Sequence, residues 1–187
     1  MKILLMCEAG RLNLGDELHS LLKTMLEQEG YEIETVVLNR EDLKPCLGCI
    51  SCWLKTPGQC IITNDPANDI VRKQVNADAI IFISKITYGG FSADIKAFLD
   101  RSIQNISPYF KDYGGEMHQP KRYKRFPVWI TVGYGDVSDE EKLTFIKLAE
   151  RNALNMFPPR YLAITVNSKE DLEKEAGNIL STLEVDA

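Results

Sequence analysis

The chain has 187 residues, of which 44% are hydrophobic, and a formal net charge of -5 at pH 7. These values predict one globular domain, residues 1–187, that buries a core without disulfides or metals. No apolar run approaches the roughly 20 residues that span a bilayer. The apolar start is also too short for a signal peptide, so we expect a cytoplasmic protein with no membrane partner. The negative net charge argues against a nucleic-acid partner, because nucleic acids are themselves negatively charged.

Hydrophobic patterning predicts strands and helices in alternation. Residues 2–6 read as a strand, and apolar residues at helical spacing from Leu14 to Leu26 predict a helix that ends at Gly30. The pattern then predicts strands at 31–38, 79–84, 127–133 and 161–166, and helices at 66–76, 91–103, 138–155 and 168–183. Residues Asp65, Ser138 and Ser168 are the expected N-caps of three of these helices. Five strands alternating with five helices predict a doubly wound α/β fold of three layers, with a parallel sheet covered on both faces.

Two connections are unusually long, residues 39–64 and 105–126, and long loops in compact domains are usually functional or disordered. The second contains the basic run KRYKR at 121–125. This run could meet the 2′-phosphate of NADPH or an acidic partner; the alternative is a solvated loop or a subunit contact. In open α/β sheets, ligands bind beyond the carboxyl ends of the strands. Three predicted loops emerge there, at 7–15, 84–91 and 133–138.

The first of these loops, CEAGRLNLGDEL, leads directly into a helix. A helix start preceded by small residues favours an anion. Gly10 and Gly15 would allow close approach of the backbone to a phosphate, and Arg11 could pair with it. The alternative is a plain turn in which Asp16 caps the helix.

The second loop carries the most specific motif, SKITYGGFSADIKAFLDR at 84–101. It resembles the S-P-x-x-x-G-x-x-S-x-x-x-K-x-F-x-D-R segment of the NADPH-dependent FMN reductase and iron–sulfur flavoprotein group, in the flavodoxin-like superfamily. The match has no gaps, although Lys85 replaces the usual proline. The alternative is that Ser92 caps a helix while Lys96, Asp100 and Arg101 form a solvated face.

The resemblance implies a flavodoxin-like fold with a five-stranded parallel sheet of order 2-1-3-4-5 and FMN in the crevice. It places the phosphate at the first loop and the ring against the second and third loops. The implied cofactor-binding residues are Gly10, Arg11, Asn13, Gly15, Ile86, Thr87, Tyr88, Gly89, Gly90, Phe91, Gly133 and Gly135. Relatives usually carry hydroxyl and amide donors in the first loop. Asp16 opposes a phosphate there, which predicts weak FMN binding.

Four of the five cysteines are clustered with the spacing C-x2-C-x2-C-x7-C, at Cys46, Cys49, Cys52 and Cys60. Thiolates in a compact loop are typical ligands of a [4Fe-4S] cluster, and the spacing resembles the compact motif of iron–sulfur flavoproteins. Zinc is the second possibility, although structural zinc more often uses two separated pairs. A labile disulfide is the third.

Together these features predict an FMN-dependent oxidoreductase that takes a hydride from NAD(P)H. It would pass electrons to a small-molecule acceptor or a redox protein through the cysteine-held cluster. One alternative is an electron carrier without a nicotinamide site. Another is a degenerate, cofactor-free module whose cysteine loop binds zinc or a partner. We expect a homo-oligomer, and no catalytic residue is identified from the sequence.

Overall fold

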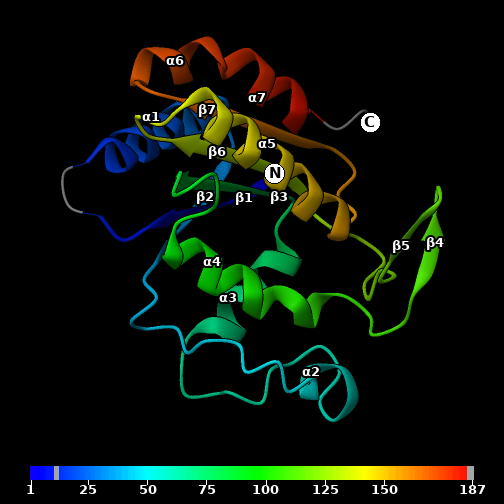
Figure 1. Cartoon of the computed structure of the whole chain (residues 1–187). Coiled ribbons are helices and arrows are strands. Elements are labelled where there is room, and N and C mark those ends of the chain that lie inside the picture. The colour runs from blue at the N-terminus through cyan, green and yellow to red at the C-terminus, as the bar shows by residue number, and fades with distance from the viewer. Residues whose placement is uncertain (11–12, 185–187) are drawn as a thin grey trace.

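The computed structural model describes residues 1–10 and 13–184. Its strands are β1 (Lys2–Glu8), β2 (Glu32–Leu38), β3 (Ala79–Lys85), β4 (Lys111–Tyr113), β5 (Glu116–His118), β6 (Val128–Tyr134) and β7 (Tyr161–Val166). Its helices are α1 (Leu14–Gln28), α2 (Ser51–Leu54), α3 (Ala67–Asn76), α4 (Ala93–Arg101), the short 3-10 helix η1 (Ser102–Asn105), α5 (Asp139–Asn155), α6 (Lys169–Lys174) and α7 (Ala176–Leu183). Figure 1 shows their arrangement.

The main sheet has five strands in the order β2-β1-β3-β6-β7, and every neighbouring pair is parallel. This confirms the predicted order 2-1-3-4-5, which is the flavodoxin-like doubly wound order. The central strand β3 is buried along its length except at Lys85, as its continuous apolar sequence predicts for a strand covered on both faces.

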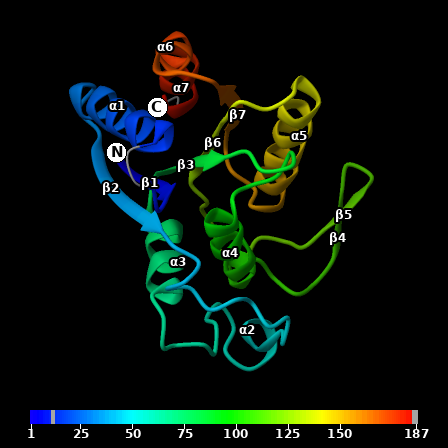
Figure 2. The same ribbon diagram turned by 60° about the vertical axis from the view of Figure 1, so that its left-hand side comes forward.

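Helices cover both faces of the sheet and complete three layers. Figure 2 shows α1, α6 and α7 on one face and α3, α4 and α5 on the other. Alternate side chains of β1 enter different cores: Leu4 and Met6 pack under α3 to α5, whereas Ile3 and Leu5 pack under α1, α6 and α7. The apolar stripes of the helices thus meet opposite faces of one sheet.

The structure differs from the predicted elements in the two long connections and at the last helix. Residues 39–64 include the one-turn helix α2, and residues 105–126 form the antiparallel hairpin β4–β5. Gly114 and Gly115 both have positive φ at the hairpin turn, so the Gly-Gly pair was an available hairpin signal. The predicted helix 168–183 is divided at Glu175 into α6 and α7.

The N-terminal ends of α1 and α3 differ in detail from the sequence-based expectation. The Asn13 side chain, rather than that of Asp16, caps α1, and the two residues form a reciprocal capping box. At α3, the carboxylate of Asp65 accepts from the N–H of Ala67, but the helix begins one residue later than expected. The predicted caps Ser138 and Ser168 are confirmed, because each accepts from a backbone N–H of the following helix.

Candidate functional site

The three predicted ligand loops lie at one edge of the sheet. Cys7 of β1 pairs with Ile83 of β3, and Lys85 of β3 pairs with Tyr134 of β6, so these strands end at similar heights. The N–H of Ile86 also donates to the carbonyl of Tyr134 at 2.8 Å, which joins the second loop to the third. This edge therefore corresponds to the position of the crevice in which flavodoxin-like folds bind their ligands.

The second loop is a tight turn in which Thr87 and Gly90 exchange backbone hydrogen bonds of 3.0 and 2.9 Å. Its two central residues, Tyr88 and Gly89, have φ of 51° and 71°. A left-handed tyrosine is strained, and such strain concentrates at functional sites. Tyr88 is 94% exposed, so its ring is accessible to a ligand.

Two other predicted residues of this loop point inward. The side chains of Ile86 and Phe91 are buried in the core under α4 and α5, and the Phe91 ring lies 5.1 Å from that of Phe145. If these two predicted residues contact a ligand, they do so through their backbones, because their side chains are buried. The N-cap role of Ser92 is confirmed, because its hydroxyl accepts from the N–H of Ile95.

Gly133 has a packing reason to be glycine. It lies within β6, and a Cβ built on it would sit 2.4 Å from Cε1 of Phe145. By contrast, Gly135 follows the strand with φ of 142°. The atom nearest to a Cβ built on Gly135 would be 3.7 Å away. Of the two glycines predicted in the third loop, Gly135 is the one whose surroundings leave space for a ligand.

Gly133→Ala is therefore expected to lower the free energy of unfolding by about 1–3 kcal/mol, because the added methyl overpacks the core. Chemical denaturation measures the loss. Gly177→Ala is the matched control, since nothing lies within 4 Å of its added Cβ in α7; it should be neutral or stabilising. Unchanged stability with weakened flavin binding in Gly133→Ala would contradict the packing role and favour a ligand contact.

The first loop contains Gly10, Asn13 and Gly15, whereas Arg11 lies outside the described residues. The capping box pairs the N–H of Asp16 with Oδ1 of Asn13 at 3.1 Å, and the N–H of Asn13 with the Asp16 carboxylate at 3.3 Å. A Cβ on Gly15 would sit 2.4 Å from the Tyr134 hydroxyl. The space beside Gly15 is thus occupied by the Tyr134 hydroxyl of the same chain and not left open for a phosphate.

A polar cluster that no local sequence pattern indicated lies at this edge of the sheet. One carboxylate oxygen of Glu8 accepts from the Tyr134 hydroxyl at 2.5 Å and from the N–H of Lys85 at 2.8 Å. The second bond needs a backbone N–H, which the proline of the motif that this segment resembles does not have. Burial and the bond to Glu8 raise the pKa of Tyr134. Burial, followed by the Asp16 and Glu8 charges, raises the pKa of Cys7 to about 11.

The four clustered cysteines line one narrow cavity of about 40 Å³ beside α4 and η1. Cys52 is buried, Cys60 is half-buried, and Cys46 and Cys49 are exposed. The left-handed conformation of Ile50, with φ of 50°, turns the chain into α2. Apolar side chains complete the wall of the cavity, namely Leu47, Ile50, Trp53, Ile62 and Ile103.

The thiols influence one another's ionisation. Burial, followed by the charges of Cys60, Cys46 and Cys49, raises the pKa of Cys52. Hydrogen bonds from the side chain and backbone of Ser51 lower the pKa of Cys49. A bound cationic centre would relieve the repulsion among the thiolates, since coordination deprotonates a thiol outright.

The donor set fits an iron–sulfur cluster. Within residues 1–10 and 13–184, no three His, Cys, Asp or Glu side chains close on a point tightly enough to hold one metal ion. The thiols instead surround an apolar cavity, and four soft thiolates are the ligand set of a [4Fe-4S] cluster. Cys46, Cys49, Cys52 and Cys60 are the residues that would hold it.

Helix α4 separates this cavity from the crevice. Ser92, at the start of α4, donates its N–H to Ser84 at the end of β3, so this end borders the crevice. Arg101, at the last residue of α4, lines the cysteine cavity. Its side chain is fully buried, which overturns the alternative that it belongs to a solvated face; the exposed Lys96–Asp100 pair does belong to one.

The basic run at 121–125 is engaged by its own chain. Arg122 donates to the carbonyls of Gln104 and Ile106 at 2.9 and 3.0 Å, and Arg125 pairs with Asp78. Arg122 therefore holds η1, whereas Lys121, Lys124 and Arg125 are exposed, so much of the run lies at the solvated surface.

The fold and these two sites define a class of protein, a flavodoxin-like α/β domain with an added cysteine site. Residues 1–120 match the family described as NADPH-dependent FMN reductase, and the chain belongs to this family of oxidoreductases. None of the helices in the described part of the chain has the length and apolarity that a bilayer crossing requires.

Individual relatives support this assignment. The chain is 32% identical to an iron–sulfur flavoprotein of Archaeoglobus fulgidus over 184 residues, covering 86% of this chain and 80% of that protein. It is 40% identical to one of Methanocaldococcus jannaschii over 77 residues, covering 41% of this chain but only 38% of that protein. An azoreductase of Bacillus anthracis shares the fold, with a TM-score of 0.66, 12% identity and coverage of 97% and 94% of the two chains.

Proposed function

We propose that this chain is an FMN-dependent oxidoreductase that is reduced by NAD(P)H and passes electrons onward through a [4Fe-4S] cluster. The observation that carries the proposal is the convergence of four cysteines on one cavity in a member of the FMN reductase family. Relatives of the chain are named iron–sulfur flavoproteins. FMN when bound would supply the hydride chemistry, and the cluster would supply one-electron transfer.

The chain's own residues would orient and tune these groups. The strained turn at Tyr88 and Gly89 would face the flavin ring with an exposed aromatic side chain and open backbone, together with Thr87 and Gly90. The start of α1, with Gly10 and Asn13, would receive the phosphate. The acceptor would be a small molecule or a redox protein, and the active form a homo-oligomer.

Anaerobic purification, followed by an absorption spectrum and assays of flavin, iron, sulfide and zinc, tests the proposal. Flavin bands together with about four irons and four sulfides per chain are the expected result. Stopped-flow mixing with NADPH should then bleach the flavin absorbance rapidly. Zinc without flavin would contradict the proposal, as would flavin that NADPH and NADH fail to reduce.

The capping box predicts that removing the charge of Asp16 strengthens FMN binding. Asp16→Asn keeps an acceptor for the N–H of Asn13 but removes a carboxylate that repels a phosphate at the same helix start. We expect FMN to bind roughly tenfold more tightly at low salt, which corresponds to about 1.4 kcal/mol. Riboflavin, which lacks the phosphate, should bind equally to both proteins in fluorescence titrations.

Glu17→Gln is the matched control. It removes the same charge from the first turn of α1, but Glu17 lies beside Lys169, 3.5 Å away, rather than in the capping box. Its effect on FMN should be much smaller. An equal response of FMN and riboflavin to Asp16→Asn would show that Asp16 does not face the phosphate.

A further inference from the structure

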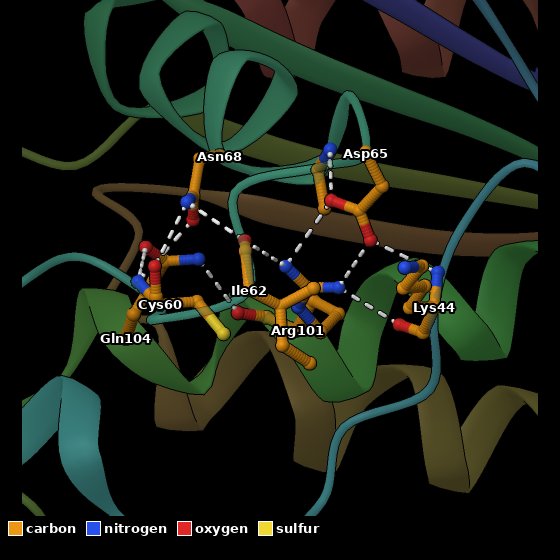
Figure 3. Close-up of polar contacts among 8 residues, drawn as sticks. Lys44, Cys60, Ile62, Asp65, Asn68, Arg101 and Gln104 are labelled. Atoms are coloured by element: carbon orange, nitrogen blue, oxygen red, sulfur yellow. Dashed lines mark hydrogen bonds and ion pairs between the residues drawn. The ribbon is translucent and has the colours of Figure 1, made fainter.

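One arginine ties together the two ends of the segment that carries the cysteines, defined here as residues 45–61. Figure 3 shows Arg101 between these ends. Its Nη1 donates to the carbonyl of Lys44 at 2.8 Å, immediately before the segment. Its Nη2 donates to the carbonyl of Ile62 at 3.2 Å, immediately after the segment. The segment is thus a loop whose base is closed by a single guanidinium group.

Asp65 fixes that guanidinium in place. The side chains of Arg101 and Asp65 are 0% and 1% exposed, and Nη1 lies 2.6 Å from Oδ2. The same carboxylate accepts from the backbone N–H of Lys44 at 2.9 Å and of Ala67 at 3.1 Å. Arg101 and Asp65 together form a clamp. This clamp connects α4, the start of α3 and both ends of the cysteine segment.

Side chains of the same region hold the fourth cysteine by its backbone. The N–H of Cys60 donates to Oε1 of Gln104 at 3.0 Å and to Oδ1 of Asn68 at 3.2 Å. Nδ2 of Asn68 returns a bond of 2.9 Å to the carbonyl of Cys60. In the middle of the segment, the indole N–H of Trp53 donates to the carbonyl of Ile103 at 3.0 Å. These bonds hold the segment at points between its clamped ends.

We infer that Arg101 is a positioning residue for the cysteine site: it closes the segment and sets the four thiols around their cavity before any metal binds. This inference rests on the proposed cluster in so far as the thiols are its ligands. Arginine suits the role because its planar guanidinium presents five N–H donors in a fixed fork. Lysine is a point charge on a flexible stem and cannot bridge a carboxylate and two separate carbonyls with the same geometry.

Two variants test the clamp. Arg101→Lys keeps the charge and loses the fork. Asp65→Leu with Arg101→Met removes both buried charges, so neither remains unpaired and the chain retains its fold. The control is Lys96→Met, which breaks the exposed Lys96–Asp100 pair on the same helix. Circular dichroism first establishes that each variant is folded.

The first measurement uses the metal-free full chain. Alkylation of Cys52 by N-ethylmaleimide and hydrogen exchange across residues 45–61 should be at least about tenfold faster in both clamp variants, because the segment opens more often. The second measurement uses protein reconstituted with iron and sulfide. Its iron should be lost to a chelator about tenfold faster from the clamp variants, while Lys96→Met matches the parent in both measurements.

The outcomes separate this inference from the proposed function. Unchanged alkylation and exchange in folded clamp variants overturn the clamp. Faster opening with iron retained as firmly as in the parent overturns its role in positioning the thiols. If the parent takes up no iron while the clamp variants still open faster, the proposed cluster fails and the closure of the segment by Arg101 stands.

Discussion

Replacing Arg101 with methionine alone is expected to lower the free energy of unfolding by about 3–5 kcal/mol, which is the usual cost of leaving a buried charge without its partner. The Asp65 carboxylate is 1% exposed, so water cannot replace the lost guanidinium. Burial works to raise the pKa of Asp65, but the bonds from Arg101 and from backbone N–H groups outweigh it and hold the pKa below its ordinary value. Urea denaturation at pH 7 measures the loss.

The double variant of Asp65→Leu and Arg101→Met provides the comparison. It removes both charges and fills the space with apolar groups, so much of the lost stability should return. The pair would then show a coupling free energy in a double-mutant cycle. If the double variant is as unstable as Arg101→Met, the loss comes from the two backbone carbonyls and not from the unpaired carboxylate.

The main sheet and its helices could be predicted because each strand and helix has its own local pattern of apolar residues. The continuous apolar run of β3 and the helical spacing of leucines in α1 are readable within a few residues. The strand order followed from the resemblance of residues 84–101 to a family, rather than from any pattern. The β4–β5 hairpin was missed although Gly114 and Gly115 mark its turn.

The details of the sites depend on contacts that no local pattern encodes. Arg101 directly follows Asp100 at the end of its helix, and its partner Asp65 lies 36 residues earlier in the chain. Gly15 and Gly133 look like ligand-facing glycines, but Tyr134 and Phe145 occupy the space beside them. Close packing between distant segments decides both cases. The clustering of the cysteines, in contrast, was visible because their spacing is local.

Cys49→Ser is expected to abolish iron binding while flavin binding stays at the level of the parent. A serine hydroxyl is a harder ligand than a thiolate and binds iron–sulfur clusters poorly. Cys49 is exposed, so the substitution leaves the core intact. The crevice borders the other end of α4, so the turn at Tyr88 is not disturbed. Iron assay and flavin fluorescence on anaerobically purified protein measure the two effects.

Cys7→Ala is the matched control for that experiment. Cys7 is buried at the end of β1, in the core under α1 and outside the cysteine segment. Its variant should retain the iron of the parent. Iron at the level of about four per chain in Cys49→Ser, or a loss of iron in Cys7→Ala equal to that in Cys49→Ser, would contradict the assignment of the ligands.

The closed base of the cysteine segment has a consequence for how such a domain can diversify. Lys44 and Ile62 meet at one guanidinium, so the ends of the segment are neighbours in space although many residues separate them in the chain. A change in the length of the segment between these fixed ends alters the free energy of loop closure only slightly. The length of residues 45–61 can therefore vary with little change in the rest of the fold.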